Sequence, residues 1–320
     1  MRAVRFDRYG GPEVLEVREV DDPVAGPGRM LVAVRAAGTN PGEIAIREGR
    51  MHERFPASFP SGQGSDLAGV VRALGEGVQG FTVGQEVLGW SEERSSQAEL
   101  VAVPAEQLVA KPPALSWEVA GSLFVAGMAA YACVLAVDPQ PGETVAVSAA
   151  AGGVGSLAVQ LVRRTGARVL GLAGEHNHAW LRAHGVVPVS YGQGQAERLQ
   201  AAAGGRLDAF IDTFGSGYVQ LAIELGVPPE RINTLIDFEA AQRFGTRAEG
   251  THAIATAGRL AELAELAASG ELEVPIARTY PLEQVRAAYK ELARRHTHGK
   301  IVLTVAQPPS APGSAGTSTA

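Results

Sequence analysis

Residues 148–155 read SAAAGGVG, and this stretch determines how the rest of the chain is interpreted. It lies where a predicted strand at 144–148 passes into a predicted helix at 154–165, and a second strand is predicted at 168–173. A run of alanines and glycines at such a place has two interpretations. It is either an ordinary tight turn or a place where the backbone must approach a bulky, negatively charged group.

Aligned on the dinucleotide-binding fingerprint G-x-G-x-x-G, the stretch places Ala150 first, Gly152 second and Gly155 third. The middle glycine lets the backbone approach a pyrophosphate, and the last lets the helix pack closely against the strand. A helix that begins near Val154 presents unpaired N–H groups and the positive end of its dipole to the phosphates. Because strand, turn, helix and second strand follow in the required order, we predict a bound dinucleotide, with Gly153 in the same loop.

The chain outside this unit divides into two regions with different sequence patterns. Residues 1–115 are rich in glycine and proline and contain short runs of alternating apolar and polar residues, which is typical of a mostly β domain. Residues 116–274 alternate predicted strands and helices, which favours a parallel sheet covered by helices on both faces. A last strand predicted at 301–305 could return to the first domain, and residues 307–320 (QPPSAPGSAGTSTA) are expected to form a disordered tail. The predicted fold class is therefore α/β.

The composition argues against several classes of protein. The chain has 320 residues, of which 46% are hydrophobic and 19% charged, enough for about two packed domains. Its net charge of −6 argues against a nucleic-acid partner, which requires a basic surface. The single cysteine, Cys133, cannot form a disulfide within the chain and fits a reducing compartment. Since we find neither a signal peptide nor a long apolar run, we expect a cytoplasmic protein with no membrane partner.

The choice between NAD and NADP depends on the segment after the second strand, GEHNH at 174–178. Glu175 favours NAD, because an acidic side chain at this place binds the ribose hydroxyls. His176, Asn177 and His178 favour the additional phosphate of NADP. Glu175 could instead be a solvated loop charge, and Asn177 could be the cap of the next helix. The spacing alone leaves the two cofactors open.

Further motifs follow one another along the chain. They are MRAV (1–4), GGPEVL (10–15), AGTNP (37–41), GSDLAGVV (64–71), AAAGGVG (149–155), DTFG (212–215) and GKIVL (299–303). Together they resemble the zinc-independent quinone reductase branch of the medium-chain dehydrogenase/reductase superfamily, up to about residue 305. The resemblance implies a GroES-like β-barrel domain at 1–115, completed by about 275–306, and a Rossmann doubly wound parallel-sheet domain at 116–274.

The resemblance implies a site without metal. Zinc-dependent members carry a cysteine at the position of Asn40 and a Gly-His-Glu motif where this chain has GSD at 64–66. Both are replaced here, and one cysteine cannot build the four-cysteine structural zinc site. His296 and His298 are interpreted as solvated loop residues, so we expect no zinc.

The resemblance also bears on the cofactor. Relatives often read Ala-Ser-x-Arg-Asn at the position of residues 173–177, so that serine has become Gly174 and arginine has become His176. Tyr191 matches a tyrosine that packs near the adenosine phosphate in relatives. The family therefore implies NADPH, with NADH as the alternative. The further residues predicted to bind the cofactor are Asn233 and Lys300.

Without zinc, hydride transfer suits acceptors that conjugation already activates, such as quinones or α,β-unsaturated carbonyls. Asn40 is the predicted hydrogen-bond donor to the acceptor oxygen, although it could be a turn residue before Pro41. Tyr131 is the second catalytic candidate, with core packing as its alternative. Asp237 and Phe238 are predicted to line the substrate pocket, unless they are a loop-terminating aspartate and a core phenylalanine.

Three functions are compatible with these residues. The leading hypothesis is an NAD(P)H-dependent oxidoreductase that reduces a quinone or an α,β-unsaturated carbonyl. A second is a reductase of a specialised-metabolite, polyketide-like intermediate, since the tyrosine near Ala45 and the threonine at Ala129 of many relatives are absent. A third is a non-catalytic NADPH-binding redox sensor. The expected partner is a small conjugated molecule, and analogy with the family implies a homodimer.

Overall fold

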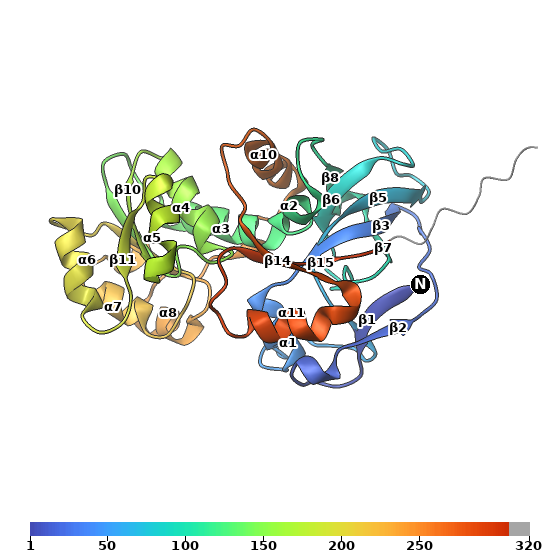
Figure 1. The fold of residues 1–320 in the computed structure, drawn as a ribbon, viewed down its shortest axis with the longest axis horizontal. Helices are drawn as coiled ribbons and strands as arrows, with labels where there is room; N and C mark the ends of the chain where they lie inside the picture. The colour runs from blue at the N-terminus through green and yellow to red at the C-terminus, as the bar shows by residue number, and fades with distance from the viewer. Residues whose placement is uncertain (307–320) are drawn as a thin grey trace, which may run out of the picture.

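The computed structural model describes residues 1–306, which form two lobes that lie side by side along the long axis of the molecule (Figure 1). The tail predicted at 307–320 lies outside the described residues. The first lobe combines the N-terminal strands with the last two strands of the chain. These strands are β1 (Arg2–Phe6), β2 (Glu16–Glu19), β3 (Arg29–Gly38), β4 (Ser61–Gly62), β5 (Asp66–Leu74), β6 (Glu86–Trp90), β7 (Leu100–Pro104), β8 (Leu108–Ala110), β14 (Ile276–Pro281) and β15 (Lys300–Thr304).

The strands of the first lobe form two sheets. The small antiparallel sheet has the order β2-β1-β4, and the large one has the order β14-β15-β3-β5-β6-β8, with β7 also paired to β3. Alternation places every second side chain in the core, as in β7 with Val101 and Val103. β15 returns to pair antiparallel with β3 and places Val302 opposite Gly38, so the strand predicted at 301–305 is present. Helices α1 (Pro41–Arg47) and α11 (Val285–Leu292) lie beside this lobe (Figure 1).

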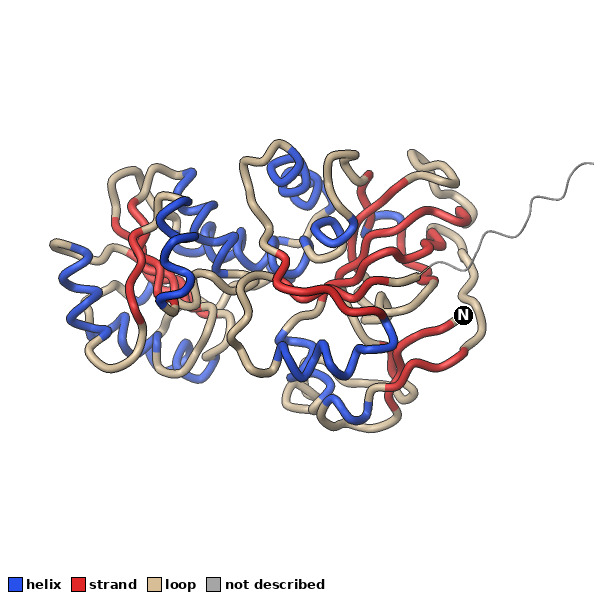
Figure 2. The backbone as a smooth tube through the Cα atoms, viewed as in Figure 1, coloured by secondary structure: helices blue, strands red, loops and turns tan. Residues whose placement is uncertain are grey.

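The second lobe is a five-stranded parallel sheet with the order β11-β10-β9-β12-β13. Its strands are β9 (Thr144–Val147), β10 (Arg168–Ala173), β11 (Val187–Ser190), β12 (Ala209–Asp212) and β13 (Ile232–Thr234). Figure 2 shows helices on both sides of this sheet; they are α4 (Gly155–Arg164), α5 (His178–Ala183), α6 (Gln195–Ala203), α7 (Tyr218–Glu224) and α8 (Phe238–Phe244). β9 and β12 are buried throughout, as parallel strands covered on both faces are. The predicted α/β class, with a doubly wound parallel sheet, is confirmed.

The order of the strands reverses at β9, which has β10 on one side and β12 on the other. In open α/β sheets, ligands bind in the crevice at the carboxyl ends of the strands where such a reversal occurs. The predicted dinucleotide loop directly follows β9 and therefore lies at this crevice.

Four helices lie between or beside the two sheets: α2 (Trp117–Ala120), α3 (Leu123–Val137), α9 (Thr251–Ile254) and α10 (Ala257–Ala268). The apolar spacing at 117–137 predicts one continuous helix, but the structure divides it. The break lies at Gly121, where the backbone packs so closely that an added Cβ would be 2.5 Å from the Ala36 carbonyl oxygen. No helix among residues 1–306 is both long and apolar enough to cross a membrane. The domain boundaries at 115 and 275 stay predictions.

Candidate active site

The loop between β9 and α4 is shaped by its glycines. A Cβ atom on Gly155 would lie 2.1 Å from the Ala149 carbonyl oxygen, and one on Gly152 would lie 3.2 Å from the same oxygen. Ala149 itself has a left-handed φ of 44°, so the backbone turns sharply after the strand. Gly155 therefore allows α4 to begin directly against the strand end, as the fingerprint requires.

The remaining predicted loop residues have different surroundings. Ala150 is fully buried, and its N–H donates to the Leu172 carbonyl at 3.0 Å, which ties the loop to β10. Val154 is the N-cap of α4, and no side chain of residues 1–306 caps this helix. The Ser156 and Leu157 N–H groups already donate to the Gly152 and Val154 carbonyls at 3.0 and 3.1 Å, so the positive end of the α4 dipole is what this helix start offers an anion. Gly153 lies against the side chain of Lys300.

A hollow opens beside this loop at the carboxyl ends of β9 and β10. It encloses about 680 Å³, a volume that includes space open to solvent. Five of the residues predicted to bind the cofactor line this hollow: Gly152, Gly174, His176, Asn177 and Tyr191. The loop and the hollow together fit the pyrophosphate and the adenosine end of a dinucleotide.

Glu175 differs from its neighbours in the same turn. Its side chain is exposed and does not line the hollow, whereas His176 and Asn177 do. The His176 Nε2 atom lies 3.1 Å from the Asn177 Nδ2 atom, so these two side chains form one polar unit. The acidic group that favours NAD thus lies outside the lining of the hollow.

A C-terminal segment that sequence reasoning did not assign to the cofactor also lines the hollow, namely Arg295, His296 and Thr297. The Arg295 guanidinium lies 3.9 Å from the centroid of the Phe214 ring and donates to the Phe214 carbonyl. The segment reaches the hollow because the Gly299 N–H donates to the Ala151 carbonyl at 3.0 Å. The one signal in the sequence is that these residues directly precede the GKIVL motif.

One buried carboxylate, that of Asp212, holds the ends of β9, β12 and β13 together. Its Oδ1 accepts hydrogen bonds from the Ser148 hydroxyl at 2.7 Å and the Gly215 N–H at 2.9 Å. Its Oδ2 accepts one from the Thr234 hydroxyl at 2.8 Å. Burial, together with the charge of Asp212, raises the pKa of Tyr218 in the lining of the hollow to about 12. Asp212 therefore organises the floor of the crevice, and Tyr218 stays a neutral phenol.

The two lobes meet at Lys300, which is 4% exposed. Its Nζ donates to Asn40 Oδ1 at 2.5 Å, to the Thr39 carbonyl at 3.1 Å and to Asp66 Oδ2 at 3.3 Å. Its aliphatic stem lies beside Gly153 of the glycine loop. All three ammonium hydrogens are thus used, and Lys300 connects the loop of the second lobe to β3 and β5 of the first.

Asn40 lies at the same junction as the N-cap of α1 and is 5% exposed. Its Nδ2 donates to Glu43 Oε1 and to Asp66 Oδ2, both at 3.1 Å. Both amide hydrogens are therefore bound within the protein. In this conformation the predicted donor has no free N–H for an acceptor, and its catalytic role stays a prediction.

Comparison with known proteins identifies the family. The family model described as "Alcohol dehydrogenase GroES-like domain" matches residues 26–136, and the one described as "Zinc-binding dehydrogenase" matches residues 181–303. The quinone oxidoreductase of Pseudomonas aeruginosa is 28% identical over 94% of this chain and 99% of its own length. The chain belongs to the medium-chain dehydrogenase/reductase superfamily and is quinone oxidoreductase-like.

Solved structures of quinone oxidoreductases share the fold of this medium-chain dehydrogenase/reductase. The quinone oxidoreductase from Coxiella burnetii has a TM-score of 0.84 at 29% identity, covering 96% of this chain and 99% of that one. The Escherichia coli quinone oxidoreductase complexed with NADPH has a TM-score of 0.83 at 25% identity, covering 95% and 100%. The first lobe is accordingly the GroES-like domain, and the second is the Rossmann-type domain.

The positions related to metal binding have other partners in this medium-chain dehydrogenase/reductase. Among residues 1–306, no three His, Cys, Asp or Glu side chains come together in a way that could hold a metal ion. Asn40, at the position of a zinc-ligating cysteine in zinc-dependent members, bonds to Lys300 and Asp66. His298 is not the solvated residue that the sequence predicts, because its ring packs 5.0 Å from that of Trp180 and burial lowers its pKa.

The remaining predicted site residues lie apart from the hollow. Tyr131 packs against the core on α3, one turn after Gly127, where Leu263 of α10 contacts the helix. Asn233 is fully buried and exchanges two hydrogen bonds with the backbone of Glu249. Asp237 caps α8 by accepting from the Ala240 N–H at 3.1 Å, and Phe238 is 44% exposed at the start of that helix. Their predicted roles in cofactor and substrate binding stay predictions.

Proposed function

We propose that this quinone oxidoreductase-like chain is an NADPH-dependent reductase that transfers hydride to a quinone or an α,β-unsaturated carbonyl. Its family supports the coarser statement that it is an NAD(P)-dependent reductase. The observation that carries the proposal is the hollow at the carboxyl ends of β9 and β10. Residues of the glycine loop and the side chains of Arg295, His176 and His296 line this hollow together.

The cofactor preference is argued from the lining of the hollow. The loop at 149–155 would hold the pyrophosphate against backbone N–H groups and the start of α4. Arg295, His176 and His296 would then face the additional phosphate of NADPH, which charge-assisted hydrogen bonds stabilise. Glu175, which would repel that phosphate, lies outside the lining. When bound, the reduced nicotinamide supplies the hydride.

The chain's own contribution at the junction of the lobes is positional. Lys300 is buried there next to the glycine loop, and its ammonium is paired with Asp66. By holding the two lobes in one arrangement, this network would orient the cofactor toward the acceptor for hydride transfer. Since Asn40 has no free N–H and Tyr131 packs in the core, we assign the final proton to solvent.

The test is a panel of quinones, α,β-unsaturated carbonyls and simple ketones, each supplied with NADH and separately with NADPH. Loss of the absorbance of the reduced nicotinamide reports turnover. We expect turnover of conjugated acceptors but not of simple ketones, with a higher kcat/KM for NADPH than for NADH. A protein that binds NADPH but oxidises it with no acceptor would instead be a redox sensor. A higher kcat/KM for NADH would contradict the cofactor assignment.

The second candidate, a reductase of a specialised-metabolite intermediate, is favoured by two positions at which the family resemblance implies other residues. Ala45 and Ala129 stand where many relatives carry a tyrosine and a threonine, and Ala129 is 5% exposed. An enoyl thioester of polyketide type therefore belongs in the panel, and its exclusive turnover would favour this candidate. The homodimer and the cytoplasmic location stay predictions.

A further inference from the structure

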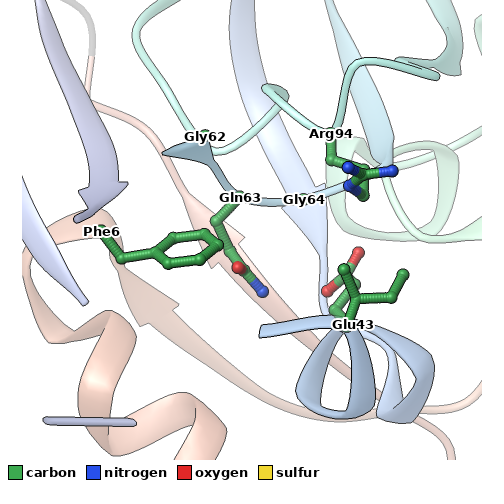
Figure 3. A pocket seen from close by; sticks show the side chains of 7 residues that line it. Phe6, Glu43, Gly62, Gln63, Gly64 and Arg94 are labelled. Carbon is green, nitrogen blue, oxygen red and sulfur yellow. The ribbon is translucent and has the colours of Figure 1, made fainter. Parts of the chain in front are cut away.

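A second layer of buried polar groups lies directly behind Asn40. Its centre is Glu43 on α1, which is 4% exposed and extends from the helix toward the segment of Gly62, Gln63 and Gly64 (Figure 3). Glu43 Oε1 accepts from Asn40 Nδ2 at 3.1 Å and from the Ser65 N–H at 3.0 Å. Glu43 Oε2 accepts from the Asn40 N–H at 3.0 Å.

The fourth donor to Glu43 comes from the other end of the chain. Tyr289 on α11 is fully buried, and its hydroxyl donates to Glu43 Oε2 at 2.5 Å. The same hydroxyl oxygen accepts from Gln63 Nε2 and Gln97 Nε2, both at 2.8 Å. The phenol is therefore saturated, and α11 holds the carboxylate of Glu43 in one place.

These contacts determine which way the Asn40 amide faces. The nitrogen and oxygen ends of an asparagine amide have nearly the same shape, so only the surrounding groups distinguish them. Here the nitrogen end meets two carboxylates, those of Glu43 and Asp66, and the oxygen end meets the Lys300 ammonium. A flipped amide would place its oxygen against both carboxylates and its N–H groups against the ammonium, which makes one orientation strongly favoured.

We propose that Glu43, held by Tyr289, is a positioning residue for the reaction. By fixing the Asn40 amide with its oxygen toward Lys300 Nζ, Glu43 keeps the Lys300 ammonium at the junction of the lobes beside the glycine loop. The proposal rests on the proposed function, in which this junction orients the cofactor toward the acceptor. Glu43 itself is buried behind Asn40 and acts through it.

The charges around Glu43 make the arrangement sensitive to pH. Burial raises the pKa of Glu43, and Asp66 on β5 adds to the shift, while Tyr289 and Asn40 oppose it. Arg47 on the same helix, Arg94 after β6 and Lys300 on β15 are the cationic groups facing this cluster. A protonated Glu43 cannot accept from all four donors. The order around Asn40 should therefore be lost as the pH falls through the pKa of Glu43, which lies above the ordinary glutamate range.

The first experiment compares Glu43→Gln with the wild type across pH, using the acceptor that the panel identifies. We expect kcat to fall by roughly tenfold to a hundredfold, the scale of a small misplacement of reacting groups. We also expect the acid limb of the kcat profile to disappear, while the Kd for NADPH, read from cofactor fluorescence, stays unchanged. Glu48→Gln, at the other end of α1, is the matched control and should behave as the wild type in all three measurements.

Tyr289→Phe tests the same inference even if Glu43→Gln does not fold. This change keeps the ring and its contact with Arg47 but removes the hydroxyl that donates to Glu43. We expect the acid limb to move to higher pH and kcat to fall, whereas the control Tyr280→Phe on β14 changes neither. Wild-type kcat and an unmoved acid limb in Tyr289→Phe would overturn the proposal.

A readout without turnover separates this inference from the proposed function. In ¹⁵N-labelled protein, the side-chain NH₂ resonances of Asn40 should be protected from solvent exchange in the wild type and unprotected in Glu43→Gln or Tyr289→Phe. Equal protection in wild type and variants would overturn the positioning role. If no acceptor is turned over but protection is lost as expected, the proposed function fails while the orientation of Asn40 by Glu43 stands.

Discussion

Among single residues, Gly155 is subject to the strictest steric requirement. The methyl group of Gly155→Ala would lie 2.1 Å from the Ala149 carbonyl oxygen, closer than real Cβ contacts allow. The loop must therefore shift at the place where a pyrophosphate would bind. We expect NADPH binding to weaken roughly tenfold or more and the free energy of unfolding to fall by about 1–3 kcal/mol. Calorimetric titration with NADPH and urea unfolding measure the two effects.

The matched control for this substitution is Gly258→Ala in α10. A Cβ on Gly258 would meet nothing within 4 Å, and its backbone φ is not in the left-handed region. Alanine is favoured over glycine inside helices, so we expect unchanged NADPH binding and equal or higher stability. Weakened NADPH binding in Gly258→Ala, or wild-type binding in Gly155→Ala, would contradict the steric argument.

Arg295 should discriminate between the two nicotinamide cofactors. In Arg295→Ala we expect the KM for NADPH to rise by roughly tenfold or more, because a charge-assisted hydrogen bond to the additional phosphate is lost. The KM for NADH should stay unchanged. Arg294→Ala, one residue earlier on an exposed side chain outside the lining, should affect neither value. An equal rise in KM for both cofactors upon Arg295→Ala would mean that Arg295 supports the fold and does not bind the phosphate.

Some residues of the site can be predicted from local sequence spacing, and others cannot. Gly152 and His176 were found because a strand, a turn and a helix place them at known offsets. Arg295 was not predicted because only the tertiary fold brings it to the hollow. The segment before β15 is held there by the hydrogen bond from the Gly299 N–H to the Ala151 carbonyl. The surroundings of Asn40 were likewise not predictable, since Glu43 is near in sequence but Asp66 and Lys300 come from distant strands.

Among the elements, one ion pair connects α3 to the strands of the Rossmann-type sheet. Glu143, directly before β9, accepts from Arg231 Nη1 at 3.1 Å and Nη2 at 2.5 Å, and Arg231 Nε donates to the Val137 carbonyl at the end of α3. This places a cation at the carboxyl end of a helix, where the dipole favours it. We expect Glu143→Gln to lower the free energy of unfolding by about 1–3 kcal/mol at neutral pH.

The pair also predicts a pH dependence of stability. Its hydrogen bonds to Arg231 lower the pKa of Glu143 from its ordinary value. A lowered folded-state pKa means that the stabilisation is present above the ordinary glutamate range and is lost as the pH falls through the lowered value. Urea unfolding of wild type and Glu143→Gln should therefore converge at acid pH. Glu48→Gln, which removes an exposed pair with Arg50, should have almost no effect at any pH.

Element types followed from the sequence more readily than element ends did. The alternation of strands and helices predicted the parallel sheet, but it did not predict that β13 ends at Thr234. Its hydroxyl oxygen accepts the N–H groups of Ile236 and Asp237, and Asp237 then caps α8. Local hydrogen bonds of this kind compete with the sheet ladder and do not alter apolar periodicity.

In the whole molecule, the two lobes contact each other at several places that are far apart in the sequence. Gly299 pairs with the glycine loop, and Lys300 reaches Asn40. A third contact joins Phe55, which follows α1, to His252 on α9, with ring centroids 5.5 Å apart. His252 is placed by its neighbour Thr251, whose hydroxyl donates to the Val125 carbonyl on α3. The Val125 N–H in turn donates to Asp66, so this contact lies on the same side as the polar junction.

We expect Phe55 and His252, whose rings meet across the two lobes, to act together on the acceptor. Phe55→Ala and His252→Ala should each raise the KM for the acceptor. In a double-mutant cycle, their effects on kcat/KM should be coupled by about 0.5–1.5 kcal/mol, as for other ring pairs. Phe59→Ala is the control, because Phe59 contacts Phe6 and Tyr9 within its own lobe and should add independently to His252→Ala. If the Phe55 and His252 effects on kcat/KM were simply additive, this contact between the lobes would not act on the acceptor.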